Sequence, residues 1–351
     1  MQSDSNVKKI STYITKKVSA RLEEIAKNDS KNFEEKWNDI KIFIEYGMLT
    51  DEKFCESAMK FALLEDTDGK FFKLDEYKEL VKSTQTDKDG NEVFLYATDK
   101  ESQYTYIKAA TDRGYNVLFM NGQLDPHFVG LLENKLEKCR LVRVDSDVID
   151  NIIPSKDKKS VELSTLQRNI CTTLFKSQIP AIENSEFFIA FEAMSGNSQP
   201  IVITQSEYMR RMKEMAAMQP GMSFYGELPD SYNMTLNTEH SVVKSIMEKA
   251  ESDLKSSIQP LEDKLAEINK AISAINDKKK NDKELTADDK SELESKEKEA
   301  ENTREEEKKI ISDYASNLDK VKQLVDIALL GNGMLKGEAL NNFLQRSISL
   351  L

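Results

Sequence analysis

The N-terminal stretch of the chain carries apolar residues at helical spacing. Over residues 6–27 they recur every three or four positions, and the same pattern returns over residues 33–46 and 51–64, which predicts three helices with one apolar face each. Trp37, the single tryptophan, stands among apolar residues at this spacing, a position that favours core packing over contact with a ligand. We therefore expect residues 1–64 to form a helical segment.

Residues 90–150 alternate between strand and helix patterns. Strands that alternate with helices are joined by crossovers and lie parallel, so this region predicts a small α/β unit. Pro154 and the polar run that follows it mark a linker, and we place the domain boundary there, between residues 154 and 155. The predicted strands are Val93–Ala97, Tyr115–Met120 and Arg140–Val144, and the helices between them are 101–113 and 126–136.

The second half of the chain opens with a helical pattern over residues 161–176. Two apolar runs, Glu186–Phe191 and Pro200–Thr204, flank the turn sequence Ser195–Ser198. This arrangement predicts two strands paired around the turn. A third strand is expected over residues 223–228.

Charged residues dominate the region from about 250 to 312, yet an apolar seam runs through its first part. The seam residues step by four and three, as in a heptad repeat. The polar run Asn276–Asp282 breaks the seam, and Thr286 with Asp289 has the sequence of a helix start. We expect a coiled-coil-like, antiparallel helical hairpin, either a solvated structural arm or a docking surface. The seam consists of Leu254, Ile258, Leu261, Leu265, Ile268, Ile272 and Ile275.

The chain ends in two apolar stripes joined by a glycine-containing turn at Gly331–Gly333. The glycines follow a helical pattern rather than a strand and lack the Gly-Lys-Ser/Thr ending of a phosphate loop, which favours a simple turn. Two short stripes in a helical hairpin suit a four-helix bundle across a two-fold axis. We therefore expect a homodimer. The predicted interface residues are Leu324, Ile327, Leu330, Phe343, Leu344 and Ile348.

A methionine-rich helix is predicted over Tyr208–Met218. Its methionines repeat every third residue, which makes a broad face of flexible, polarizable side chains that accept many apolar shapes. Such a face either fills a core or contacts a partner. Arg210, Arg211 and Lys213 lie between the methionines and favour an exposed helix. The methionines are Met209, Met212, Met215 and Met218.

Composition excludes several classes of function. The net charge of −12 over 351 residues disfavours nucleic acid or an anionic membrane as the main partner. Three separated cysteines and two isolated histidines predict no disulfide framework, no metal site and no catalytic triad. We find no glycine-rich nucleotide fingerprint, leader or membrane span. We expect a cytoplasmic protein without catalytic residues or a cofactor of its own.

Motifs at both ends of the chain resemble one family. Leu324–Leu330, the glycine turn and Phe343–Ile348 resemble the final dimerising helices of the ninety-kilodalton heat-shock chaperones, and Gln2–Val18 with Phe33–Trp37 resembles the later middle domain of the same family. The motifs stand in the same order as in that family. The resemblance implies a bacterial form, in which residues 1–154 belong to the middle domain and residues 155–351 form the C-terminal dimerisation domain.

The resemblance also implies an α+β fold and a function. It implies a stress-response chaperone portion that binds unfolded clients through the methionine helix and Trp37, dimerises, and works with co-chaperones. The full-length family is a weak ATPase, with ATP and Mg²⁺ in an N-terminal domain that no segment here resembles. The hairpin at about 250–312 is longer than the family's common pattern. The alternative hypothesis is a structural adaptor whose hairpin docks one specific partner.

Overall fold

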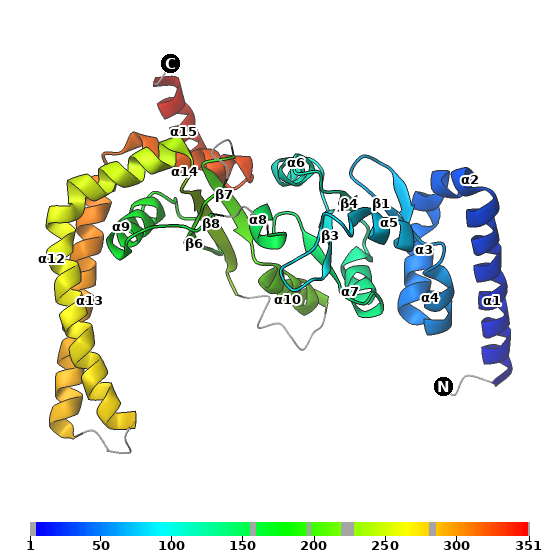
Figure 1. Ribbon diagram of the computed structural model, residues 1–351, viewed down its shortest axis with the longest axis horizontal. Coiled ribbons are helices and arrows are strands. Elements are labelled where there is room, and N and C mark those ends of the chain that lie inside the picture. The colour runs from blue at the N-terminus through cyan, green and yellow to red at the C-terminus, as the bar shows by residue number, and fades with distance from the viewer. Residues whose placement is uncertain (1–4, 155–158, 195–197, 219–227, 281–285, 350–351) are drawn as a thin grey trace. The chain divides into compact units, whose positions relative to one another are not determined.

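The computed structural model describes residues 5–154, 159–194, 198–218, 228–280 and 286–349. Within these ranges the chain forms helices and three small sheets (Figure 1), which is the α+β class expected from the sequence. The elements are distributed over two compact units, which we call unit 1 and unit 2.

The division into units differs from a single cut along the chain. Unit 1 comprises Met1–Asp157 and Gln205–Leu228, and unit 2 comprises Lys158–Thr204 and Pro229–Leu351. The chain first passes from unit 1 to unit 2 between Asp157 and Lys158, close to the domain boundary expected at residue 154. The methionine helix, α10 (Glu207–Met218), falls in unit 1, whereas the sequence interpretation assigned it to the second domain.

Four helices open unit 1 and enclose an aromatic core. The Asp51 carboxylate begins the fourth helix by accepting a hydrogen bond from the Phe54 N–H at 3.0 Å, which satisfies a free amide of the first turn. Phe33 and Trp37 have ring centroids 5.8 Å apart. Trp37 is 1% exposed, so the core interpretation of this residue is confirmed. The helices are α1 (Ser5–Asn28), α2 (Ser30–Glu35), α3 (Trp37–Thr50) and α4 (Glu52–Ala58).

The helix predicted over residues 51–64 ends early because its last residues form a strand. β1 (Leu63–Glu65) pairs with β2 (Phe71–Lys73) in an antiparallel ladder. In the turn between them, the Asp66 carboxylate accepts hydrogen bonds from two backbone amides, both at 2.9 Å. A three-residue strand is too short to show an alternating pattern, so the sequence interpretation missed this hairpin.

The parallel sheet predicted in unit 1 is confirmed. Its strands run in the order β4-β3-β5, and both outer strands are parallel to β3. Alternate residues of β3 face opposite sides: Phe94 joins the cluster that contains Trp37, whereas Leu95 joins a second cluster. The strands are β3 (Glu92–Ala97), β4 (Val117–Phe119) and β5 (Cys139–Arg143), and the helices are α5 (Leu74–Val81), α6 (Tyr104–Thr111), α7 (Asp125–Lys135) and α8 (Ile149–Ile152).

The sheet of unit 2 corrects the predicted strand pairing. Its order is β6-β8-β7, so β8 (Asp230–Asn237) lies between the two strands that were expected to pair with each other. β6 (Ser185–Glu192) is parallel to β8 over its whole length, and β7 spans Ile201–Gln205. The strand predicted over 223–228 falls almost entirely outside the described residues.

The helical hairpin of unit 2 follows the prediction. Thr286 and Asp289 form the expected capping box at the start of α13. At the base of the hairpin, Ile258 and Ile311 are fully buried in the main cluster of unit 2. Farther out, a small separate cluster continues the seam. The helices of unit 2 are α9 (Thr165–Lys176), α12 (Ser241–Lys280), α13 (Ala287–Ala315), α14 (Asp319–Gly331) and α15 (Gly337–Ser349).

Candidate functional site

The α10 helix presents apolar and aromatic side chains at its surface. Tyr208 is 67% exposed, and Met209 and Met212 are half-buried. The helix is described through Met218, but the side chains of Met215 and Met218 lie outside the described residues. The two methionine side chains that the structure describes are therefore partly accessible to solvent.

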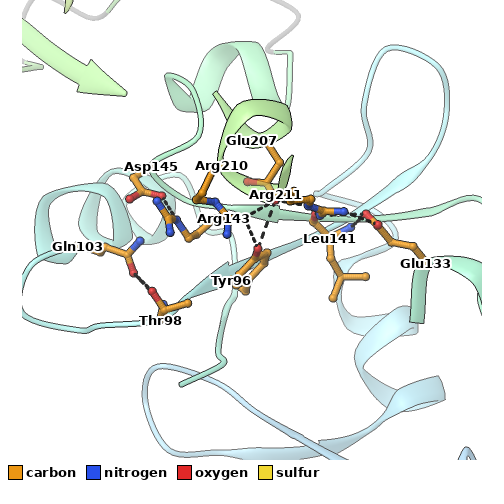
Figure 2. A network of polar contacts seen from close by, with 10 residues as sticks. All are labelled: Tyr96, Thr98, Gln103, Glu133, Leu141, Arg143, Asp145, Glu207, Arg210 and Arg211. Carbon is orange, nitrogen blue, oxygen red and sulfur yellow. Dashed lines mark hydrogen bonds and ion pairs between the residues drawn. The ribbon is translucent and has the colours of Figure 1, made fainter. Parts of the chain in front are cut away.

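Arg210 faces inward, which overturns the argument that the basic residues of α10 mark an exposed helix. The residue is 8% exposed. The guanidinium donates hydrogen bonds to the Tyr96 hydroxyl oxygen at 2.7 Å and to Glu207 Oε1 at 2.6 Å (Figure 2). Tyr96 in turn donates to Glu207 Oε1 at 3.3 Å. Arg210 thus joins α10 to strand β3.

Arg211 joins the same helix to two further elements of unit 1. It donates to Glu207 Oε1 at 2.6 Å, to Glu133 Oε2 of α7 at 2.7 Å and to the Leu141 carbonyl of β5 at 2.6 Å (Figure 2). The Leu141 N–H donates to Glu133 Oε1 at 2.9 Å, which closes a ring of three residues. Just before α10, the Gln205 N–H donates to the Asp145 carbonyl at 3.1 Å.

The charges of this network balance, and the pKa shifts follow from its geometry. Burial and the charge of Glu207 raise the pKa of Tyr96 to about 12. Burial alone would raise the pKa of Glu207, but the hydrogen bonds and charges of Arg210 and Arg211 outweigh it, and the pKa lies below its usual value. Burial opposes the charge of Arg211, yet Glu133 and Glu207 raise its pKa. Both shifts favour the charged forms of Glu207 and Arg211 at neutral pH.

Trp37 lies apart from this site. It is 1% exposed and belongs to the aromatic core of unit 1. The expectation that Trp37 contacts clients is wrong for this conformation, because a fully buried ring offers no surface to another chain.

The six predicted interface residues on the terminal helices fall into two groups that differ in burial. Phe343 is 7% exposed and Leu324 is half-buried, and both contribute to the core of unit 2. Phe343 is therefore a core residue of unit 2 that offers little surface to another chain. The remaining four form exposed apolar surface on α14 and α15: Ile327 at 49%, Leu330 at 42%, Leu344 at 49% and Ile348 at 69%.

A buried carboxylate that the sequence analysis did not identify links these two helices. Asp326 on α14 is 1% exposed and pairs with Arg346 on α15. Lys322 Nζ lies 2.6 Å from Asp326 Oδ1. One carboxylate with two cationic partners holds the helical hairpin together inside one protomer. Its signal in the sequence is a single Asp within the otherwise apolar run Leu324–Leu330.

The chemistry of the other candidate residues is limited. Cys55, Cys139 and Cys171 are free and buried, and burial raises the pKa of the Cys139 and Cys171 thiols to about 12, which disfavours reactive thiolates. Over the described residues, no three His, Cys, Asp or Glu side chains are arranged to hold a metal ion. Within the same ranges, no helix is long and apolar enough to cross a membrane.

Comparison with known proteins identifies relatives over the whole chain. Residues 1–265 match the family model described as Hsp90 protein. A Bacteroides thetaiotaomicron protein named chaperone protein HtpG is 52% identical over 353 residues, which cover 100% of this chain and 52% of that protein. A Porphyromonas gingivalis protein of the same name is 48% identical with the same coverage. The chain thus spans about half the length of the curated relatives it matches.

Among solved structures, the middle domain of a Plasmodium falciparum heat shock protein is similar with a TM-score of 0.34 at 16% identity. It covers 41% of this chain and 58% of that one, a likeness too weak to support an argument. The family assignment therefore depends on the sequence matches, which extend through unit 1 and into the helical hairpin. The chain belongs to the Hsp90 protein family.

Proposed function

We propose that this chain is the client-holding and dimer-forming part of a molecular chaperone. Membership of the Hsp90 family and the name of the relatives support a chaperone. One observation assigns the client contact to α10. This helix exposes Tyr208 and part of Met209 and Met212 to solvent, whereas Arg210 and Arg211 form hydrogen bonds to other elements of unit 1. Methionine and tyrosine give apolar contact without demanding one shape, as binding of many unfolded chains requires.

The exposed surface of α14 and α15 supports the second half of the proposal. Four apolar side chains there are between 42% and 69% exposed, and an apolar strip of this kind is commonly covered by another protein surface. We propose that a second copy of the chain covers it in an isologous contact.

Further properties are proposed for the longer protein. We propose that it is a weak ATPase that binds ATP and Mg²⁺ outside these 351 residues, works in the cytoplasm and meets co-chaperones there. The buried free thiols fit a reducing compartment. No residue of this chain is assigned to ATP hydrolysis.

The methionine face is tested by suppression of client aggregation. The variant Met209→Ser, Met212→Ser and Met215→Ser should suppress aggregation of a heat-unfolded model client several-fold less well than the unchanged chain, because it removes apolar contact area. Leu80→Ser, on α5, removes a side chain that is 47% exposed elsewhere in unit 1 and serves as the matched control. Equal suppression by the triple variant and the control would contradict the assignment of α10 as the client contact.

A further inference from the structure

The attachment of α10 to unit 1 is polar. None of its described side chains belongs to the hydrophobic clusters of that unit. Its described buried residues are Arg210 and Ala216, and alanine contributes little apolar area. Since hydrophobic stabilisation scales with the apolar area removed from water, the side chains of α10 that the structure describes hold it only weakly by packing. The hydrogen-bonded guanidinium groups must supply much of the attachment.

The two arginines also determine how the helix is rotated. Successive residues of an α-helix point about 100° apart, so Arg210 and Arg211 leave the helix in different directions. Arg210 reaches Tyr96 on β3, whereas Arg211 reaches Glu133 on α7 and the Leu141 carbonyl on β5 (Figure 2). Contacts to three elements in two directions fix both the position of α10 and its rotation about its own axis.

We propose that Arg210 and Arg211 are positioning residues for the client contact: they form an electrostatic latch that holds α10 on unit 1 with Tyr208 and the methionine edge outward. This inference builds on the proposed function, because it names the residues that orient the proposed contact helix. The latch requires the forked guanidinium group. Lysine keeps the charge but lacks the planar, multi-donor geometry that serves three acceptors at once.

Loss of one arginine has two effects that add. The helix loses its charge-assisted hydrogen bonds, and carboxylates that remain in a half-buried position lose their partner. Without Arg211, Glu133 and Glu207 both lack a cation that lies within 2.7 Å of each. α10 should therefore open locally more often while the core of unit 1 stays folded, because the helix contributes little to that core.

Hydrogen exchange of the amides within residues 205–218 tests the latch directly, without any client. In Arg211→Ala the exchange of these amides should be at least about tenfold faster than in the unchanged chain, with Arg211→Lys between the two. Arg21→Ala is the matched control, since Arg21 forms an exposed pair with Glu24, and it should change α10 exchange by less than about twofold. Unchanged α10 exchange in Arg211→Ala would overturn the inference.

A second variant and a salt series test the latch even if Arg211→Ala does not fold. Glu133→Gln keeps the shape of the side chain and removes its charge, and should also accelerate α10 exchange. Raising salt from about 0.05 M to about 0.5 M should accelerate α10 exchange in the unchanged chain more than exchange of the β3 amides. The Arg211 and Glu133 side chains are 30% and 25% exposed, so salt weakens their attraction in part, whereas the β3 ladder depends on backbone hydrogen bonds. If neither Glu133→Gln nor added salt changes the exchange of the α10 amides, the proposed latch is likewise excluded.

Client holding by the same proteins separates the two proposals. Arg211→Ala should hold clients less well than Arg21→Ala, with the same thermal midpoint of unfolding within error. Faster α10 exchange in a chain that never holds clients would support the latch and remove the proposed function. Full client holding by Arg211→Ala despite faster exchange would show that the arginines do not position the client contact.

Discussion

At the scale of single residues, unit 1 buries two carboxylates beside one lysine. Glu45 on α3 and Asp125 at the start of α7 are each 2% exposed. Lys41 Nζ lies 3.0 Å from Asp125 Oδ2 and 3.5 Å from Glu45 Oε1. One cation cannot neutralise two buried carboxylates, so the cluster is electrically neutral only when one of them carries a proton. Burial raises the pKa of Glu45 to about 8, against the opposing charge of Lys41 and with the help of Asp125.

The pH dependence of stability follows from this shift. The folded-state pKa of Glu45 exceeds its ordinary 4.5, so between these values the folded chain holds a proton that the unfolded chain releases. Stability of unit 1 should therefore fall as the pH rises from 5 to 8, by roughly 2–4 kcal/mol from this group. In Glu45→Gln, the free energy of unfolding measured with denaturant should fall much less between pH 5 and pH 8 than it does in the unchanged chain.

An exposed carboxylate supplies the control for Glu45. Glu24 on α1 has a side chain that is 55% exposed, and Glu24→Gln should leave the pH slope of the unchanged chain intact. Parallel slopes for Glu45→Gln and the unchanged chain would show that Glu45 is ionised in the folded protein at neutral pH.

At the scale of elements, the base of the hairpin has a similar carboxylate. Glu307 on α13 is 8% exposed; Glu262 of α12 faces it, and α9 contributes Asn169, which donates to Glu262. Burial and Glu262 raise the pKa of Glu307 to about 7, while Arg304 lowers it. A proton on Glu307 removes the repulsion between the two helices, so α12 and α13 should be held together less firmly above pH 7 than below it.

Glu307→Gln should make the junction insensitive to pH. In the unchanged chain, hydrogen exchange at residues 258–262, corrected for the intrinsic pH effect, should accelerate several-fold between pH 6 and pH 8. In Glu307→Gln this acceleration should be absent, because the amide carries no charge. Glu306, the exposed neighbour, gives the matched variant Glu306→Gln, which should behave like the unchanged chain. If exchange at residues 258–262 still accelerates with pH in Glu307→Gln, loss of the proton from Glu307 is not the cause.

The packing of the hairpin also bears on the adaptor hypothesis. Leu254, Ile258 and Ile311 are part of the main cluster of unit 2, whereas the outer seam around Leu265 and Ile268 forms a cluster of its own. The base of the hairpin is thus structural, and any partner-docking role belongs to its outer part. Removal of the whole hairpin would expose core residues and could not separate the two roles.

At the scale of the whole molecule, the proposed dimer depends on exposed rather than buried terminal residues. Replacing Ile327, Leu344 and Ile348 by Ser removes side chains that are 49%, 49% and 69% exposed, so it should leave the protomer folded and shift sedimentation at micromolar concentration from dimer to monomer. Phe43→Ser, which alters a 75% exposed residue of α3, should remain dimeric. A monomeric unchanged chain at that concentration would refute the dimer.

Phe343→Ala separates folding from association. Because Phe343 contributes to the core of unit 2, its truncation should destabilise that unit by about 3 kcal/mol, seen as an earlier unfolding transition. This outcome differs from the triple serine variant, whose unfolding at fixed pH should change only through loss of the partner.

The sequence by itself determined the local elements of this protein. The spacing of apolar residues predicted the long helices and the parallel strands β3, β4 and β5, and Thr286 with Asp289 predicted the start of α13. These signals act over a few residues, so they can be interpreted without knowing the fold. The family resemblance was carried by short motifs of the same kind and agreed with the family match.

Only the tertiary structure decided which residues face each other over long separations. β8 lies between β6 and β7, although those two strands are closer along the chain. Phe343 is buried, while Leu344, one position later, is exposed on the same apolar helix. Arg210 bonds to Tyr96, which lies 114 positions earlier, so its burial has no local signal. An arginine becomes an inward residue only where distant parts of the chain supply acceptors that replace water, and that is a property of the fold.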